Sequence, residues 1–198
     1  MTLLTLIRHG QTDWNLARRI QGSTDIPLNE TGRAQAADAA AMLRGERFDH
    51  VYASPLVRAH ETAAIIAEHL ALPAPLTTRG MREREFGDGE GLLVADFLEK
   101  YGSWHGEVPG AETLEQVTER ALRSLERIAR AARQRSAPRA ESVLVATHGG
   151  VIRALLLHAS GGTLPRDGEL LGNASVHRFV AERGGIRLLT EVGVSAPL

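Results

Sequence analysis

Two apolar runs, Thr2–Ile7 and Ser142–Ala146, have the length of β-strands and show no regular alternation with polar residues. Continuous runs of this kind are typical of strands that are covered on both faces, as in the centre of a parallel sheet. A shorter strand is expected over Asp49–Ala53, and another near Leu76. The pattern therefore places at least two buried strands far apart along the chain.

In the segments that follow these strands, apolar positions recur at intervals of three and four residues, which predicts amphipathic helices. Two helices begin at capping signals: Ser54-Pro55 precedes one, and Thr113 with Gln116 three residues later fits a capping box. A weaker helical stretch follows the polar turn Arg8–Asp13, and residues 72–91 are rich in proline and glycine and predict a loop. The expected helices are Asn29–Leu43, Leu56–Leu70, Leu92–Tyr101, Thr113–Gln134 and Gly149–Ala159.

Strands that alternate with helices indicate the α/β class. We expect a three-layer α/β/α arrangement with a mainly parallel central sheet and helices on both faces. The runs Ala174–Ala181 and Ile186–Val192 flank Gly184-Gly185, which predicts a terminal hairpin at one edge of the sheet. The most loop-like long stretch, Arg133–Glu141, is expected only to join a helix to a strand, so we expect one domain over residues 1–198.

Composition excludes several classes of function. Lysine and arginine total 23 against 24 aspartates and glutamates, a net charge of -1, which argues against a nucleic-acid binder with a basic excess. The absence of cysteine excludes disulfides, thiolate zinc sites and cysteine nucleophiles. The N-terminal apolar run stops at Arg8 and His9, too early for a signal sequence or a membrane span, so we expect a cytoplasmic protein that does not bind membranes.

Two histidines directly follow two of the predicted strands: Arg8-His9-Gly10 comes after the first, and Thr147-His148-Gly149-Gly150 after the second. Ligands of open α/β sheets bind at the carboxyl ends of the strands, so the two imidazoles can meet in one crevice. Gly149 and Gly150 also open a helix whose N-terminal amides favour an anion. A single histidine after a strand is more often structural, but two such units favour a catalytic crevice. The other histidines are assigned to surface or structural roles: His50, His60, His69, His105, His158 and His177.

Arginines and carboxylates are available to the same crevice. Arg8 adjoins His9, and Arg58 lies in the first turns of a helix that follows a strand, so two guanidinium forks can flank a phosphate dianion. Arginines on helices are usually solvated, and the position of Arg58 is what favours this role. The loop Arg82–Gly91 carries four carboxylates, one of which can serve as proton donor to a leaving group, although charge-rich loops are usually only solvated.

At these residues the chain resembles the histidine phosphatase superfamily, also called phosphoglycerate mutase-like, over nearly its whole length. Residues 6–15 (LIRHGQTDWN) are similar to the opening signature of that family, R-H-G-x-T-x-x-N. R-H-G alone would be weak evidence, whereas the full set of blocks in order is specific. The later blocks are matched by Gln21-Gly22 with 25–28 and 31–36, by 54–59 with 61–63, by 82–91, by 109–113, and by His148-Gly149-Gly150 with Arg153.

The resemblance implies a phosphomonoester hydrolase that forms a phosphohistidine on His9 and needs neither a cofactor nor a metal. It also implies that Glu83, rather than Glu85 or Glu90, is the proton donor. The expected mechanism requires a neutral His9 held by a hydrogen bond from its other ring nitrogen to a backbone carbonyl, a protonated His148, and a Glu83 of raised pKa. The implied phosphate-binding residues are Arg8, Arg58 and His148, with further contacts from Asn15, Gln21, Gly22 and Gly149.

Other interpretations stay open beside this one. A phosphoglycerate mutase would use the same site, but mutases of the family are generally longer, which favours hydrolysis here. A metal hydrolase is disfavoured because no H-x-H or H-E-x-x-H spacing is present and Arg8 adjoins His9. A non-catalytic phospholigand-binding protein is disfavoured by the complete catalytic set, and a P-loop kinase is excluded because its motif is absent.

Substrate choice is expected to depend on Leu92–Ala111, which is predicted to cover the crevice. Phe97, Tyr101, Trp104 and His105 can form a pocket wall there or simply pack together. Two positions depart from the family pattern and can alter the pocket: Gly89 stands where a tryptophan is common, and Ala111 where a glycine is. The expected partner is a small-molecule phosphomonoester, with phosphoglycerates, sugar phosphates and nucleotide-like phosphates such as ribazole phosphate unranked. The terminal hairpin can pair across a homodimer axis or close a sheet edge.

Overall fold

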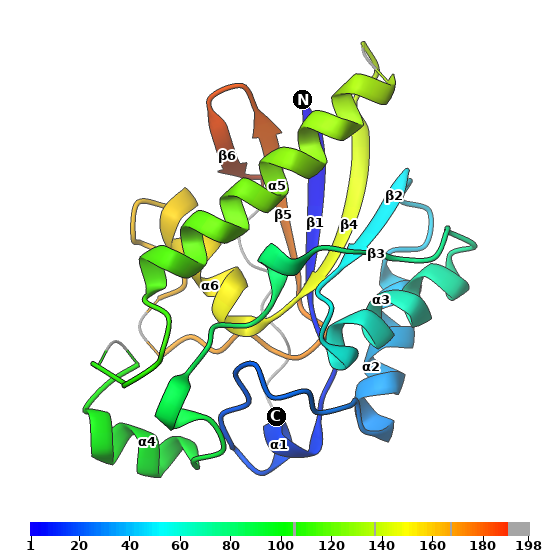
Figure 1. The fold of residues 1–198 in the computed structure, drawn as a ribbon. Helices are drawn as coiled ribbons and strands as arrows, with labels where there is room; N and C mark the ends of the chain where they lie inside the picture. Colours follow the sequence, from blue (N-terminus) through cyan, green and yellow to red (C-terminus); the bar gives the residue numbers. More distant parts are fainter. Residues whose placement is uncertain (105, 137, 167, 190–198) are drawn as a thin grey trace.

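The computed structural model describes residues 1–104, 106–136, 138–166 and 168–189. In this part of the chain the strands form a six-stranded sheet in the order β3-β2-β4-β1-β5-β6 (Figure 1). The first four run parallel to one another, whereas β5 runs antiparallel to β1 and to β6. The predicted mainly parallel sheet with a hairpin at one edge is therefore confirmed. The strands are β1 (Thr2–Arg8), β2 (His50–Ala53), β3 (Leu76–Thr77), β4 (Glu141–Thr147), β5 (Val176–Glu182) and β6 (Gly185–Leu188).

Helices α5 and α6 cover one face of the sheet, and α2 and α3 cover the other. The short helices α1 and α4 lie beyond the edge at which β1 and β4 end (Figure 1). No helix within the described ranges combines the length and apolar character that crossing a bilayer requires. The helices are α1 (Asp13–Leu16), α2 (Glu30–Met42), α3 (Val57–His69), α4 (Val94–Tyr101), α5 (Leu114–Ser136) and α6 (Gly149–Ala159).

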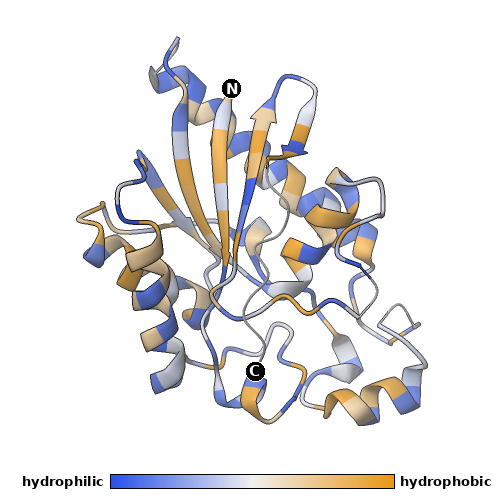
Figure 2. Ribbon diagram, turned by 180° about the vertical axis from the view of Figure 1, so that it is seen from behind, coloured by the Kyte–Doolittle hydropathy of each residue, from blue (hydrophilic) through white to orange (hydrophobic). Residues whose placement is uncertain are grey.

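Residues of the central strands alternate between two hydrophobic cores. In β4, Val143 and Val145 pack beneath α5 and α6, whereas Leu144 and Ala146 pack against α2 and α3. Because both faces are covered, every position from Val143 to Ala146 is apolar, which explains the continuous run in the sequence. Figure 2 shows the resulting hydrophobic colouring of the central strands.

Two local predictions at helix starts had different outcomes. The capping box of α5 is confirmed: the Thr113 N–H donates to Gln116 Oε1 over 2.8 Å, and the Gln116 N–H donates to Thr113 Oγ1 over 3.2 Å. The cap at Ser54-Pro55 is wrong, because α3 begins at Val57 and its cap position, Leu56, makes no side-chain cap bond. The Ser54 hydroxyl lies instead 2.7 Å from Nε2 of His148.

Two predicted boundaries also changed. Helix α5 continues to Ser136, so the connection to β4 is shorter than the expected loop. Strand β6 ends at Leu188, and the part of the predicted strand beyond 189 lies outside the described residues.

Candidate active site

The two histidines that follow β1 and β4 lie side by side. These strands are parallel neighbours, with Arg8 paired to Thr147, so the next residue of each strand emerges at the same level. The His9 N–H continues the ladder by donating to the Thr147 carbonyl over 2.9 Å. The ring centroids of His9 and His148 are 5.2 Å apart. The convergence predicted from two distant stretches of sequence is therefore confirmed.

The environment of His9 prepares Nε2 as a nucleophile. Its Nδ1 lies 2.7 Å from the carbonyl oxygen of Gly10. A carbonyl only accepts, so Nδ1 carries the proton and Nε2 keeps its lone pair. Burial, followed by the charges of Arg58 and Arg8, holds the pKa of His9 well below its ordinary value. The expected neutral imidazole with a bond to a backbone carbonyl is what the structure contains.

The surroundings of His148 favour a neutral ring as well, and the protonated imidazole expected when a phosphoryl group is bound stays a prediction. Burial lowers its pKa well below the ordinary value, and the charges of Arg58 and His9 act in the same direction. Its Nε2 is bonded to Ser54, whereas its buried Nδ1 has no hydrogen-bond partner. Only additional negative charge close to the ring would reverse this preference.

Arg8 and Arg58 place their guanidinium groups close to His9. Arg58 is fully buried and donates from Nη1 to the Thr24 carbonyl and from Nη2 to the Gly22 carbonyl, both over 2.8 Å. Each Nη atom carries a second hydrogen, so Nη1 and Nη2 keep one N–H each beside Nε, and the expected fork on a phosphate stays a prediction. Arg8 donates from Nη1 to the Leu171 carbonyl. The Nε atoms of both arginines are buried without a partner.

These unpaired nitrogens define a site for an oxyanion. A buried polar group left without a hydrogen bond costs about 1–3 kcal/mol, so three such groups near His9 favour the binding of a ligand with several oxygens. The groups are Nε of Arg8, Nε of Arg58 and Nδ1 of His148. Gly149, the first residue of α6, leaves Arg8 uncovered, because a Cβ there would lie 3.3 Å from Arg8 Nε. The N-terminus of α6 thus adds its dipole beside the two arginines.

Glu90 holds the loop at Gly22 in place through hydrogen bonds, a role that was not predicted from the sequence. The Glu90 carboxylate accepts the N–H groups of Ser23 over 2.8 Å and Thr24 over 3.1 Å. Burial alone would raise the pKa of Glu90, but the hydrogen bonds from Ser23 and Thr24 outweigh it and lower the pKa. Gly22 has a φ of +54°, and a Cβ there would lie 2.1 Å from Glu90 Oε1. Glu90 therefore fixes the loop whose carbonyls hold Arg58.

The amide side chains of Asn15 and Gln21 form hydrogen bonds to the nearby residue Thr12. Asn15 Oδ1 accepts the N–H of Thr12 over 3.1 Å, and Gln21 Oε1 accepts the Thr12 hydroxyl over 3.0 Å. Their oxygens are therefore engaged, and only their NH2 groups suit a phosphate oxygen. Their assignment to phosphate binding stays a prediction.

Among the carboxylates of the predicted acid block, Glu83 reaches the site. It accepts the Gly150 N–H over 3.2 Å, one residue inside α6, and the N–H of Arg84 over 2.8 Å. A Cβ on Gly150 would lie 2.4 Å from Glu83 Oε1, so the glycine makes this approach possible. Glu85 instead pairs with Arg82 over 2.9 Å at a partly exposed position. The geometry is compatible with Glu83 as the proton donor.

Two further residues orient the backbone of the nucleophile and were missed in the sequence. Thr62 accepts the Gly10 N–H over 3.0 Å and donates to the Arg58 carbonyl over 2.7 Å. Asn173 donates to the His9 carbonyl over 3.1 Å. Thr62 follows Arg58 by four residues on α3, so both side chains lie on the same face of the helix. This spacing could have been recognised in the sequence. Asn173 has no such signal, because it reaches the site from a loop far along the chain.

The segment expected to cover the crevice mainly forms a small core of its own. Phe97 is fully buried and packs on Phe86, Tyr101 and Trp104, with ring centroids 5.1–5.9 Å apart. Phe97 also explains the glycine at 89, because a Cβ there would lie 2.6 Å from its ring. The packing alternative thus holds for three of the four aromatic residues, and the fourth, His105, lies outside the described residues.

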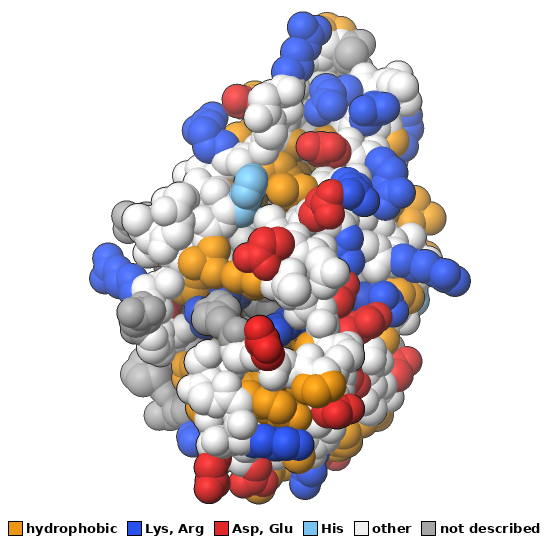
Figure 3. Space-filling model, turned by 60° about the vertical axis from the view of Figure 1, so that its left-hand side comes forward, with side chains coloured by type: hydrophobic (Ala, Val, Ile, Leu, Met, Phe, Trp, Pro, Cys, Tyr) orange, Lys and Arg blue, Asp and Glu red, His pale blue; other side chains and the backbone are white. Residues whose placement is uncertain are grey.

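A cavity of about 710 Å³ lies beside the acid block. Arg84 and residues from 106–115, including Ala111 and Glu112, line it. The cavity is not lined by any of the residues with a predicted role in phosphoryl transfer, which are Arg8, His9, Arg58, Glu83 and His148. Acidic, basic and apolar side chains are interspersed over the face shown in Figure 3. The departure at Ala111 therefore bears on this cavity and not on the catalytic set.

The next question is whether the described residues could bind a metal ion. Within the described ranges no group of three or more histidines, cysteines, aspartates or glutamates is placed to hold a metal ion. The charges closest to His9 are guanidinium groups, which repel a cation.

The buried histidines predict how folding stability depends on pH. The pKa values of His9 and His148 lie well below 6.5 in the folded protein, and that of His177 falls to about 4 through burial. Between pH 6.5 and these lower values the unfolded chain binds protons that the folded chain does not. Stability is therefore complete above about pH 6.5 and is lost as the pH falls, by about 1.4 kcal/mol per pH unit for each histidine.

Urea unfolding at pH 7.5, 6 and 5 measures this effect. We expect an unfolding free energy lower by about 6 kcal/mol at pH 5 than at pH 7.5, because three histidines each contribute about 1.4 kcal/mol per pH unit below pH 6.5. His177→Asn should flatten the profile, whereas His69→Ala, a change at an exposed histidine, should leave it unchanged. Equal stability at all three pH values would contradict the neutral burial of these rings.

Comparisons with known proteins agree with this geometry. A family model described as histidine phosphatase superfamily (branch 1) matches residues 4–192. The uncharacterized phosphatase PhoE of Bacillus subtilis is 38% identical over 189 residues, covering 94% of this chain and 93% of that protein. A 2,3-bisphosphoglycerate-dependent phosphoglycerate mutase of Gloeobacter violaceus is 36% identical, covering 79% of this chain and 75% of its own.

Among solved structures, a mycobacterial glucosyl-3-phosphoglycerate phosphatase in complex with VO3 superposes with a TM-score of 0.81. It is 27% identical and covers 98% of this chain and 99% of its own. The relatives thus include both phosphatases and mutases.

Proposed function

This chain belongs to the histidine phosphatase superfamily, and we propose that it is a phosphomonoester hydrolase in which His9 accepts the phosphoryl group. The observation that carries the proposal is the set of three buried, unpaired nitrogens on Arg8, Arg58 and His148 around a neutral His9. Such a set suits a tetrahedral anion with several oxygens, and His9 lies against it as a nucleophile.

In the first step, Nε2 of His9 attacks phosphorus, forming an N–P bond as the ester P–O bond breaks. Glu83 gives its proton to the departing oxygen, which would otherwise leave as an alkoxide. Arg8 and Arg58 offset the charge of the phosphoryl oxygens in a largely buried site, where solvent screens charge interactions less. The negative charge of the substrate also favours protonation of His148, which the protein's own groups oppose.

In the second step, Glu83 takes a proton from water, and the resulting hydroxide attacks the phosphohistidine. The N–P bond breaks, inorganic phosphate leaves and His9 returns to its neutral form. The proposal assigns no metal to this cycle, because the guanidinium groups supply the positive charge that Mg²⁺ supplies in other phosphoryl transfers. We further propose that the enzyme acts in the cytoplasm on small molecules.

Mutase activity is the alternative, since relatives of this chain include phosphoglycerate mutases. A mutase returns the phosphoryl group from His9 to a second hydroxyl of the same molecule, whereas a hydrolase passes it to water. The site described above serves both outcomes, and the difference depends on whether water reaches the phosphohistidine.

A single set of assays separates these outcomes. The chain is incubated with a panel of phosphomonoesters, and released inorganic phosphate is measured beside phosphoglycerate isomerisation. Rapid quenching with labelled substrate should trap an acid-labile, alkali-stable phosphoenzyme. Isomerisation without phosphate release would favour the mutase, and failure to trap label or release phosphate from any monoester would refute both.

Glu83→Gln tests the proton donor through the leaving group. Nitrophenolate leaves without a proton, so kcat/KM for 4-nitrophenyl phosphate should fall less than about fivefold, whereas kcat/KM for an alkyl phosphate should fall about 10²-fold or more. The comparison uses kcat/KM because kcat also includes the attack of water, for which Glu83 is the proposed base. Glu85→Gln, on the partly exposed neighbour, is the matched control and should leave both substrates unaffected. Equal losses on the two substrates would remove Glu83 from this role.

A further inference from the structure

Side chains hold the four carbonyls of the backbone segment that ends at Glu83. We define the acid loop as Gly80–Glu83. The carbonyls of Gly80, Arg82 and Glu83 accept hydrogen bonds from Arg120 over 2.9, 2.8 and 3.0 Å. The remaining carbonyl, that of Met81, accepts the Thr147 hydroxyl over 2.8 Å. One guanidinium group thus holds three of four consecutive carbonyls.

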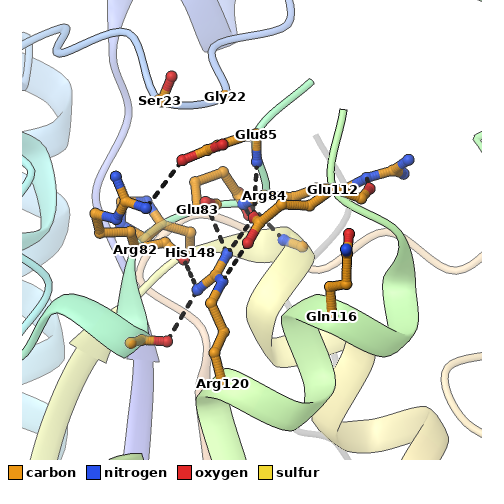
Figure 4. A network of polar contacts seen from close by, with 12 residues as sticks. Gly22, Ser23, Arg82, Glu83, Arg84, Glu85, Glu112, Gln116, Arg120 and His148 are labelled. Atoms are coloured by element: carbon orange, nitrogen blue, oxygen red, sulfur yellow. Dashed lines mark hydrogen bonds and ion pairs between the residues drawn. The ribbon is translucent and has the colours of Figure 1, made fainter. Parts of the chain in front are cut away.

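Arg120 is itself held by Glu112. It extends from α5, and its Nε and Nη2 atoms each donate over 2.7 Å to a different carboxylate oxygen of Glu112 (Figure 4). The two side chains are only 19% and 16% exposed, and the five bonds of Arg120 match the five N–H groups of a guanidinium. Burial alone would raise the pKa of Glu112, but the bonds from Arg120 and from the Glu85 N–H outweigh it and lower the pKa. The pair is therefore ionised and fully bonded.

The acid loop has little freedom to move independently of α5. A Cβ on Gly80 would lie 1.9 Å from Ser124 Oγ and 2.8 Å from the Arg120 carbonyl, so loop and helix are in direct backbone contact. The carboxylate of Glu83 reaches the N-terminus of α6 through a bond of 3.2 Å to Gly150. A displacement of its backbone would carry the carboxyl group away from the site.

From these contacts we propose that Arg120 is a positioning residue for the proton donor: it fixes the acid loop so that the carboxyl group of Glu83 meets the leaving oxygen. Glu112 orients the guanidinium group of Arg120 so that its Nη atoms reach the carbonyls of the acid loop. The inference rests on the proposed function, in which Glu83 protonates the leaving group. Neither Arg120 nor Glu112 touches the phosphoryl group.

Arg120→Lys is the informative variant, since it keeps the positive charge but loses the planar five-donor fork. A misplacement of about 1 Å at a catalytic group can lower the rate about 10²-fold. We expect kcat/KM for an alkyl phosphate to fall at least about tenfold further than for 4-nitrophenyl phosphate, because only the alkyl ester needs the proton. Arg123→Lys is the matched control: it lies on the same helix, pairs only with the exposed Glu119, and should leave both substrates unchanged.

A second measurement separates positioning from a general effect on folding. If Arg120 acts through Glu83, the double variant Glu83→Gln/Arg120→Lys should hydrolyse the alkyl phosphate no more slowly than Glu83→Gln alone. Losses that multiply, or losses equal for the two substrates, would overturn the proposal. Circular dichroism and thermal melts of each variant establish that folded protein is compared.

Glu112→Gln supports or overturns the same proposal should Arg120→Lys fail to fold. It keeps an acceptor and removes one charge, so a smaller loss with the same preference for the alkyl phosphate is expected, and a loss without that preference would count against the proposal. Failure of the proposed function has a different signature: wild-type protein would release no phosphate, or Glu83→Gln would show no dependence on the leaving group.

Discussion

His9→Ala should lower kcat by at least about 10⁴-fold, because the variant has no atom that can form the phosphoenzyme. Phosphate release and trapping of labelled protein should be lost together. The fold should persist, since the ring makes one side-chain hydrogen bond, to the adjacent Gly10 carbonyl, and the strand ladder at this position is formed by the backbone.

The control for this variant is His69→Ala at the end of α3, remote from the crevice and bonded only within its own helix. It should retain normal turnover. Residual turnover of His9→Ala within tenfold of wild type would show that another group accepts the phosphoryl group, or that water attacks directly.

Arg58→Lys should lower kcat/KM by about 10³-fold, equivalent to about 4 kcal/mol of transition-state stabilisation. The guanidinium group bonds two carbonyls of the loop at Gly22 and still presents Nε to the oxyanion. An ammonium group has neither the reach nor the planar geometry to do all three at once. The inhibition constant for orthovanadate or phosphate should rise in parallel with the loss of kcat/KM.

Arg33→Lys provides the matched control, because Arg33 lies on neighbouring α2 and forms a partly exposed ion pair with Glu61. Exposed pairs contribute about 0–1 kcal/mol, so activity and inhibitor binding should be unchanged. If Arg58→Lys retained wild-type inhibitor binding, the role of Arg58 as a phosphoryl ligand would be wrong.

The candidate site was predictable where function depends on the end of a strand. His9 and His148 follow the two most apolar runs, and neighbouring parallel strands present their carboxyl ends at one edge. The glycines at 149 and 150 could also be recognised in the sequence, and the structure explains them, because a side chain there would come close to Arg8 or Glu83. These inferences need only local pattern and the topology of an α/β sheet.

Side chains with more than one possible partner were harder to interpret. The Ser54 hydroxyl has the sequence context of a helix cap but bonds to His148, and Arg58 uses one N–H of each Nη atom to hold a loop carbonyl. The lowered pKa of His148 was also not predicted, because it results from burial and from the charges of Arg58, Arg120 and Arg8. Each of these outcomes depends on distances between elements that are remote in the chain.

By itself, the sequence determined the order of strands and helices, the hairpin at the end, and the two histidines at strand ends, because burial of apolar runs and the geometry of parallel strands follow from residue pattern. Only the tertiary structure decided which residues hold the loops of the site in place. Glu90 holds the loop that binds Arg58, and Arg120 with Glu112 holds the loop that carries Glu83. The physical reason is that a hydrogen bond forms with whichever acceptor folding brings within about 3 Å, and spacing along a chain does not specify that acceptor.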